Sequence, residues 1–89
     1  MRLNPKIKSA ADSLDYDVDY SRWIIAGDSL LDANVTSEDG LIIKSVMVSS
    51  PRIKIWVSGG ETGKTYDISI TVTTTQGRAL ASSFSMRIT

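Results

Sequence analysis

The chain of 89 residues contains no cysteine and no histidine. Without cysteine it can form neither a disulfide framework nor a thiolate metal site. Without histidine it lacks the commonest general base and the commonest neutral metal ligand, and a conventional catalytic triad cannot be assembled. We therefore expect a protein that is not an enzyme and that has no catalytic residues, no cofactor and no metal.

Long apolar runs are also absent. No stretch approaches the roughly 18 apolar residues that span a bilayer, and residues 1–11 lack the apolar region of a signal peptide. We expect a soluble, unprocessed protein with no membrane partner. A chain of this length buries only about 60–65% of its unfolded surface, so we expect one small domain with a single modest core.

The charges balance, with ten lysines and arginines against ten aspartates and glutamates, but they are unevenly spread. Residues 11–39 hold eight acids and one base, whereas residues 40–89 hold six bases and two acids. These can be ordinary solvated faces that neutralise each other within one domain. Alternatively, acidic and basic surfaces of neighbouring subunits meet in a ring-like homo-oligomer. No basic patch interleaved with aromatic residues appears, so we expect no nucleic-acid partner.

Alternating apolar and polar residues, interrupted by turn signals, run through most of the chain. Between the first two alternating segments, a short turn or single helical turn is expected, capped by Ser21 and ended by Gly27. Residues 1–11 are basic and show no clear strand pattern, so we expect an N-terminal arm at 1–11 before a single domain at 12–89. The strands that the pattern predicts are Leu14–Tyr20, Asp28–Ser37, Leu41–Val48, Arg52–Val57, Thr65–Thr74 and Ala79–Ile88.

The same alternation predicts the core. Leu14, Tyr16, Val18 and Tyr20 share one face of the first strand. Trp56 lies on the opposite face of its strand from the core row, where it either covers the outer face of the sheet or marks an intersubunit contact. The remaining inward residues are Ile53, Ile55 and Val57 in one row, and Ile68, Ile70 and Val72 opposite Leu80, Phe84, Met86 and Ile88.

Tyr66 follows the Gly63-Lys64-Thr65 turn, at the start of a long strand. This placement resembles the tyrosine corner of immunoglobulin and fibronectin type III sandwiches, in which the tyrosine hydroxyl bonds back to the preceding turn. The expected fold is therefore all-β: an antiparallel Ig-like or fibronectin-like sandwich of about six to seven strands without a disulfide.

The glycine-rich stretch before Tyr66 contains half of a phosphate-binding loop. Gly63, Lys64 and Thr65 fit its second half, but the first glycine of that motif falls on Ser58. The motif must also open a helix, whereas the alternation from Thr65 onward is that of a strand. We therefore expect Gly59, Gly60 and Gly63 to serve a turn with unusual backbone angles, and Lys64 to be a surface charge.

Asp15, Asp17 and Asp19 have the spacing that opens a calcium-binding loop. Such a loop needs glycine at its sixth position and glutamate at its twelfth, where this chain has Tyr20 and Ala26. The alternative, which the failed pattern favours, is three carboxylates on the solvent face of a strand. No metal site is expected here.

Six fragments, spread over most of residues 12–88, form a pattern through their order and spacing. The fragments are Leu14-Asp15-Tyr16-x-Val18-Asp19-Tyr20-Ser21-x-Trp23, Gly27-Asp28-Ser29, Ile55-Trp56-Val57-Ser58-Gly59-Gly60, Gly63-x-x-Tyr66, Ile70-Thr71-Val72-Thr73-Thr74 and Gln76-Gly77-Arg78. Together they resemble small tailed-bacteriophage proteins of the fibre–tail adaptor family. Where the family commonly has tryptophan before Ser21, this chain has Tyr20.

The resemblance implies a non-enzymatic β-sandwich, present in several copies in a virion that assembles in the host cytoplasm. Its partners would be tail, neck or fibre proteins, and residues 1–11 would order against a neighbour. The alternative is an Ig-like module that decorates the capsid or binds surface carbohydrate. The family-motif residues singled out as structural are Tyr16, Tyr20, Trp23, Trp56, Gly59, Gly60, Gly63, Tyr66, Gly77 and Arg78.

Overall fold

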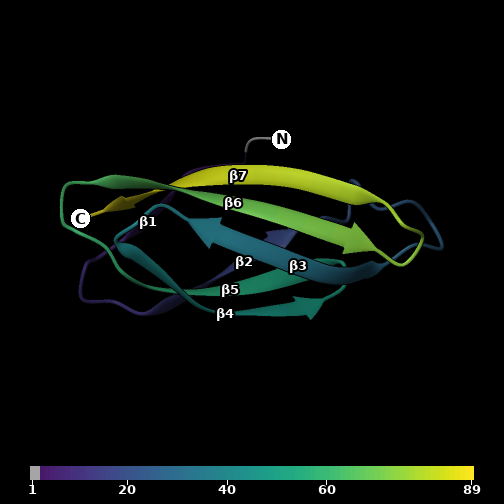
Figure 1. Cartoon of the computed structure of the whole chain (residues 1–89), viewed down its shortest axis with the longest axis horizontal. Helices are drawn as coiled ribbons and strands as arrows, with labels where there is room; N and C mark the ends of the chain where they lie inside the picture. Colours follow the sequence, from purple (N-terminus) through teal and green to yellow (C-terminus); the bar gives the residue numbers. More distant parts are fainter. Residues whose placement is uncertain (1–2) are drawn as a thin grey trace.

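The computed structural model describes residues 3–89 and shows two β-sheets packed face to face (Figure 1). Met1 and Arg2, which begin the expected arm, lie outside the described residues. Within residues 3–89 there is no helix, and the all-β prediction is confirmed. The strands are β1 (Lys6–Lys8), β2 (Leu14–Asp19), β3 (Leu30–Ser37), β4 (Leu41–Ser49), β5 (Arg52–Gly59), β6 (Thr65–Thr74) and β7 (Ala79–Ile88).

The strand order is that of an immunoglobulin-like sandwich. One sheet has the order β2-β5-β4 and the other β1-β7-β6-β3. In an immunoglobulin constant domain the corresponding sheets are A-B-E-D and C-F-G. Here the first strand leaves its usual place beside β2 and pairs in parallel with β7, with Lys6 opposite Met86 and Lys8 opposite Ile88.

The core lies between the sheets and follows the predicted alternation. Every second residue of β6 from Tyr66 to Thr74 is buried, and these residues lie beside the buried residues of β7 on the inner face of the same sheet. Leu80 and Tyr16 are only partly buried, and Leu14 is 39% exposed because it begins β2, an edge strand. The buried apolar residues are Val18, Tyr20, Leu30, Leu41, Ile53, Ile55, Val57, Tyr66, Ile68, Ile70, Val72, Phe84, Met86 and Ile88.

Burying this set is the main stabilising term of the fold. A fully buried isoleucine, valine, phenylalanine or methionine contributes about 1.5–3 kcal/mol relative to an exposed one. The β-branched side chains of β5 and β6 suit extended backbone and pack against the facing sheet. Because the buried residues of β5, β6 and β7 alternate with exposed ones along each strand, these strands could be recognised from the sequence.

The N-terminal segment contains a strand that its sequence did not indicate. Besides the pairing of β1 with β7, the Leu3 N–H donates to the Ser83 carbonyl at 2.7 Å and the Thr89 N–H donates to the Lys8 carbonyl at 2.8 Å. Lys8 is 1% exposed. Three residues are too few for an alternation to be visible, and a buried lysine conceals the pattern. The division into an arm at 1–11 and a domain at 12–89 stays a prediction.

The segment after β2 contains turns and no helix. The Trp23 N–H donates to the Tyr20 carbonyl and the Asp28 N–H to the Ile25 carbonyl, both at 2.9 Å. The expected capping by Ser21 is not what holds this turn: the Asp19 carboxylate accepts the Ser21 N–H at 2.8 Å. The aspartate oxygen reaches two residues along the chain, as in an Asx turn.

The edge strands β3 and β4, one from each sheet, both carry a bulge. The register of β3 against β6 shifts at Leu31, and that of β4 against β5 shifts at Lys44. Bulges bend an edge strand and disturb its free hydrogen-bonding groups, and a lysine at the edge opposes pairing with another chain. The bulge at Lys44 also leaves Ile42 and Met47 on the same outer face of β4, although they are five residues apart.

Candidate interaction surface

The residues singled out in the sequence gather at three places. Tyr20, Trp23, Gly77 and Arg78 lie at one end of the sandwich, where the connections β2–β3, β4–β5 and β6–β7 meet. Gly59, Gly60, Gly63 and Tyr66 lie at the opposite end, at the β5–β6 connection. Tyr16 and Trp56 lie between the ends, on β2 and β5.

The first of these places, which we call the loop end, comprises residues 20–29, 50–51 and 75–78. It is at the right of Figure 1, where the β2–β3 connection meets the β6–β7 hairpin. The Thr75 N–H donates to the Ser29 carbonyl at 3.0 Å, and the Gln76 side-chain amide donates to the Gly27 carbonyl at 3.1 Å. The Tyr20 N–H donates to the Pro51 carbonyl at 2.9 Å. The three connections therefore form one hydrogen-bonded unit.

Asp28 is the centre of this unit. Its Oδ1 atom accepts hydrogen bonds from the Ser29 N–H at 2.9 Å, the Thr75 hydroxyl at 3.0 Å and the Gln76 N–H at 3.2 Å. Its Oδ2 atom lies 3.2 Å from Nη1 of Arg78, and its side chain is 1% exposed. The carboxylate thus joins Gly27-Asp28-Ser29 to Gln76-Gly77-Arg78, two fragments that carried the family resemblance separately.

The pKa of Asp28 reflects these bonds. Desolvation by itself raises the pKa, but hydrogen bonds from the Thr74 side chain and from Ser29, Thr75 and Gln76 outweigh it and lower the pKa to about 2. Asp28 was not among the residues singled out from the sequence as a site. The signal for it was its place in one of the two fragments, because an aspartate beside a positive-φ glycine is a common turn-forming residue.

The surface of the loop end carries two exposed apolar side chains. Trp23 is 42% exposed and Ile25 is 54% exposed. The Trp23 ring packs edge-on against Tyr20, with ring centroids 6.0 Å apart and an angle of 65° between the planes. Tyr20 is itself buried, and its hydroxyl is 2.6 Å from the Ser82 hydroxyl. Trp23 is therefore supported from the core while part of its ring faces solvent.

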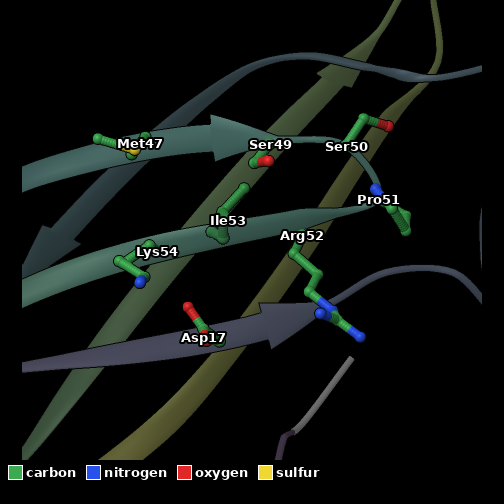
Figure 2. A pocket seen from close by; sticks show the side chains of 8 residues that line it. All are labelled: Asp17, Met47, Ser49, Ser50, Pro51, Arg52, Ile53 and Lys54. Carbon is green, nitrogen blue, oxygen red and sulfur yellow. The ribbon is translucent and has the colours of Figure 1, made fainter.

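A shallow groove of about 520 Å³ lies on the outer face of the β2-β5-β4 sheet (Figure 2). Met47 and Lys54 approach it from β4 and β5, and Asp17 from β2. Arg52 Nε lies 3.7 Å from Asp19 Oδ2, and Lys54 Nζ lies 3.3 Å from Asp15 Oδ2. Exposed ion pairs of this kind contribute little to stability, because water and salt screen them. The groove therefore has mixed charge and an apolar border, and it offers no concentrated charge to a ligand.

The aspartates of β2 lie on a strand facing solvent, as the alternation predicted, and two of the three are in these ion pairs. Among residues 3–89, no group of three or more potential metal-binding side chains is close enough to hold an ion. The same residues also form no helix long and apolar enough to cross a membrane.

Trp56 lies beside this groove, on the outer face where it was expected. It is 37% exposed and is paired with Ser45 of β4 and Asp15 of β2. Its diagonal neighbours on β4 include Ile42 and Met47, which are 57% and 60% exposed. On β2, the Tyr16 hydroxyl donates to the Ile7 carbonyl at 3.2 Å and so connects the edges of the two sheets.

At the glycine-rich end the predicted turn is observed. Gly59, Gly60 and Gly63 have φ angles of +78°, +96° and +90°, which side-chain-bearing residues rarely adopt. β6 begins at Thr65 as a strand, so no helix N-terminus is present to receive a phosphate. The Glu61 N–H donates to the Tyr66 hydroxyl at 3.1 Å, which confirms the tyrosine corner. Lys64 is exposed and lies 2.9 Å from Glu61.

Two comparisons with known proteins bear on this arrangement. A family model described as "Podophage GP4 fiber-tail adaptor protein gp77" matches residues 8–87 of the chain. The matched range includes the loop end, the glycine-rich turn and all strands except the first two residues of β1 and the last residue of β7. No curated protein matches the chain.

Proposed function

Since the chain belongs to the podophage GP4 fiber-tail adaptor family, we propose that it is a non-enzymatic subunit that joins the phage tail or neck to fibres or to adjacent tail proteins. The family match over residues 8–87 is the observation that carries this proposal. Several copies would occupy each particle, in a ring-like arrangement around the tail, after assembly in the host cytoplasm.

The shape of the molecule supports an adaptor role. An adaptor must contact two different partners at once, and this sandwich is elongated, with extents of 42 × 20 × 18 Å. The loop end and the glycine-rich turn lie at opposite ends of the long axis (Figure 1). Each end is held by its own hydrogen bonds, around Asp28 at one end and around Tyr66 at the other. Two rigid ends allow two partners to be held at a fixed separation.

The alternative role of a carbohydrate-binding module receives less support. Sugar rings stack on flat aromatic surfaces, and Trp56 is the one aromatic side chain on the outer face of β2-β5-β4. Its exposed apolar neighbours, Ile42 and Met47, are aliphatic. A patch of tryptophan, isoleucine and methionine is instead typical of contacts between proteins.

The proposal is tested by phage particles produced without this chain. We expect particles with filled heads that lack fibres, and we expect the purified protein to restore fibre attachment when it is added back. Particles that keep their fibres and lose only capsid stability would contradict the adaptor role and favour decoration of the capsid.

A further inference from the structure

Building on the proposed adaptor function, we propose that the loop end is the docking face for another virion protein, and that this partner offers an apolar socket rimmed by carboxylates. Three properties of residues 20–29, 50–51 and 75–78 point to this docking face and to the chemistry of its partner: exposed apolar side chains, a rigid backbone and an excess of arginine.

The apolar centre of this face is Trp23 with Ile25. Both stay substantially exposed although they lie on a ten-residue connection that is hydrogen-bonded to its neighbours. The connection is fixed at its start by the bond from Tyr20 to Pro51 and at its end by Asp28 and Ser29. A loop that is already ordered loses little conformational entropy on binding. Tryptophan is also among the residue types that contribute most to binding at protein interfaces.

The charged side chains of the loop end offer hydrogen-bond donors to a partner and almost no hydrogen-bond acceptors. Arg22 and Arg78 are exposed, whereas Asp28, the one acid among residues 20–29, 50–51 and 75–78, is buried and already accepts several hydrogen bonds. The Arg78 guanidinium has five N–H groups, and its Nη1 atom donates to Asp28. The Arg78 side chain is 46% exposed, so its other N–H groups remain available to a partner.

Arg52 extends this donor-rich border. It begins β5 next to Pro51, its side chain is 64% exposed, and its Nε pairs with Asp19 Oδ2 at 3.7 Å, which leaves further N–H groups of the guanidinium available. Asp19 in turn accepts the Ser21 N–H. Guanidinium groups bind carboxylates in a planar, two-pronged geometry. Two arginines on the loop end and a third next to it are therefore complementary to a socket with carboxylates at its border.

A protein fits this face better than a nucleic acid. Binding to a phosphate backbone draws its strength from many lysines and arginines. Here residues 20–29, 50–51 and 75–78 contain two arginines and one aspartate, a net charge of +1. Arg78 and Arg52 also have their own carboxylates beside them. With so little excess charge, the apolar side chains must supply much of the contact, and they require an apolar partner.

A photo-reactive benzoylphenylalanine in place of Ile25, in chains assembled into phage particles, tests the docking face. The matched control carries it in place of Thr71, an exposed residue in the middle of β6 on the outer face of the other sheet. We expect Ile25 to cross-link to one virion protein at least about ten times more than Thr71, in a peptide that contains aspartate or glutamate. Equal or weaker cross-linking at position 25, or cross-linking to DNA, would overturn the proposal.

Charge reversal tests the carboxylate rim. We expect Arg22→Glu to reduce the amount of chain in purified particles at least about tenfold, whereas Lys44→Glu, on the β4 bulge, leaves it unchanged. Both purified variants should melt within about 2 °C of the original chain, since both side chains are exposed. Exchanging a carboxylate in the cross-linked partner peptide for lysine should restore Arg22→Glu incorporation. Normal incorporation of Arg22→Glu would contradict the proposal.

These results separate the inference from the adaptor role on which it rests. A chain that is present in fibre-bearing particles, and required for the fibres, but that cross-links through Thr71 and not Ile25 contradicts only the docking face. Particles that do not contain the chain at all contradict both.

Discussion

The Oδ2 atom of Asp28 lies 3.2 Å from Nη1 of Arg78, a residue 50 positions later in the chain. This pair, with the bonds from Thr75 and Gln76 to Oδ1, fixes the β2–β3 connection to the β6–β7 hairpin. A buried carboxylate that already accepts several hydrogen bonds cannot be replaced without leaving donors unpaired. The order of the loop end therefore depends on Asp28.

Asp28→Asn should lower the melting temperature at pH 7 by several degrees, because asparagine keeps the size of the side chain but loses the charge and one acceptor position. The folded-state pKa of about 2 lies below the ordinary value of 3.8, so ionised Asp28 favours the folded state. That stabilisation is fully present above pH 3.8 and is lost as the pH falls through about 2. Between pH 7 and pH 2, the melting temperature of Asp28→Asn should fall by less than that of the original chain.

Asp39→Asn is the matched control for this titration, since Asp39 is an exposed acid in the β3–β4 turn. Its melting temperature at pH 7 should stay close to that of the original chain. If Asp28→Asn melts like Asp39→Asn and keeps the acid-induced decrease of the original chain, the proposed role of Asp28 is wrong.

Tyr66→Phe removes the hydroxyl that accepts the Glu61 N–H and leaves that donor unpaired in a part-buried position. We expect a loss of about 1–2 kcal/mol in the free energy of unfolding, measured by urea denaturation. Tyr16→Phe removes a hydrogen bond at an exposed position, where water can replace the hydroxyl, and should cost less than about 0.5 kcal/mol. Equal losses of unfolding free energy in the two variants would show that the Tyr66 hydroxyl does not stabilise the β5–β6 connection.

Gly60→Ala and Gly63→Ala separate crowding from backbone strain. Both glycines have positive φ, but a Cβ at Gly60 meets Ile88 Cγ1 at 2.7 Å and Leu41 Cδ1 at 3.3 Å, whereas a Cβ at Gly63 meets nothing within 4 Å. Backbone strain alone should lower the free energy of unfolding of Gly63→Ala by about 1–2 kcal/mol. Gly60→Ala should lose roughly 1–3 kcal/mol more than Gly63→Ala, because Ile88 must move within the core. Urea denaturation that gives the two variants the same stability would contradict this packing.

Lys8→Met tests how β1 is held. Lys8 is 1% exposed and its ammonium donates to the carbonyls of Ser9 at 2.6 Å and Gly59 at 2.7 Å, so it fixes β1 to the glycine-rich turn. Methionine fills a similar volume but donates no hydrogen bond, and the expected loss is about 2 kcal/mol in the free energy of unfolding. Lys6→Met, at a partly buried position of the same strand, should cost less than about 0.5 kcal/mol. Faster amide exchange at Thr89, whose N–H donates to the Lys8 carbonyl, should accompany the loss in Lys8→Met alone.

The strands with long alternation could be predicted from sequence, and those without it could not. The bounds of β6 and β7 agree to the residue with those expected, because ten residues of alternation leave one register in which the apolar side chains are buried. β1 has three residues and turns a lysine inward, so no local pattern reveals it. The bulge at Lys44 was equally hidden, and simple alternation would place Ile42 and Met47 on opposite faces.

The sites follow the same division. The turn glycines and the tyrosine corner depend on residues close together in the sequence, so both could be predicted from local signals. The ion pair of Asp28 and Arg78 depends on two loops that only the sandwich topology brings together. The sequence resemblance marked both loops, but nothing in either loop indicates that the two are in contact.

An averaged electron-microscopy reconstruction of the phage tail tests the adaptor assignment most directly. We predict several symmetry-related copies of a two-sheet sandwich, about 42 Å long, between the tail and the bases of the fibres, with the loop end against another virion protein. Sandwiches of this shape found only on the capsid surface, or no such density at the junction of tail and fibre, would contradict it.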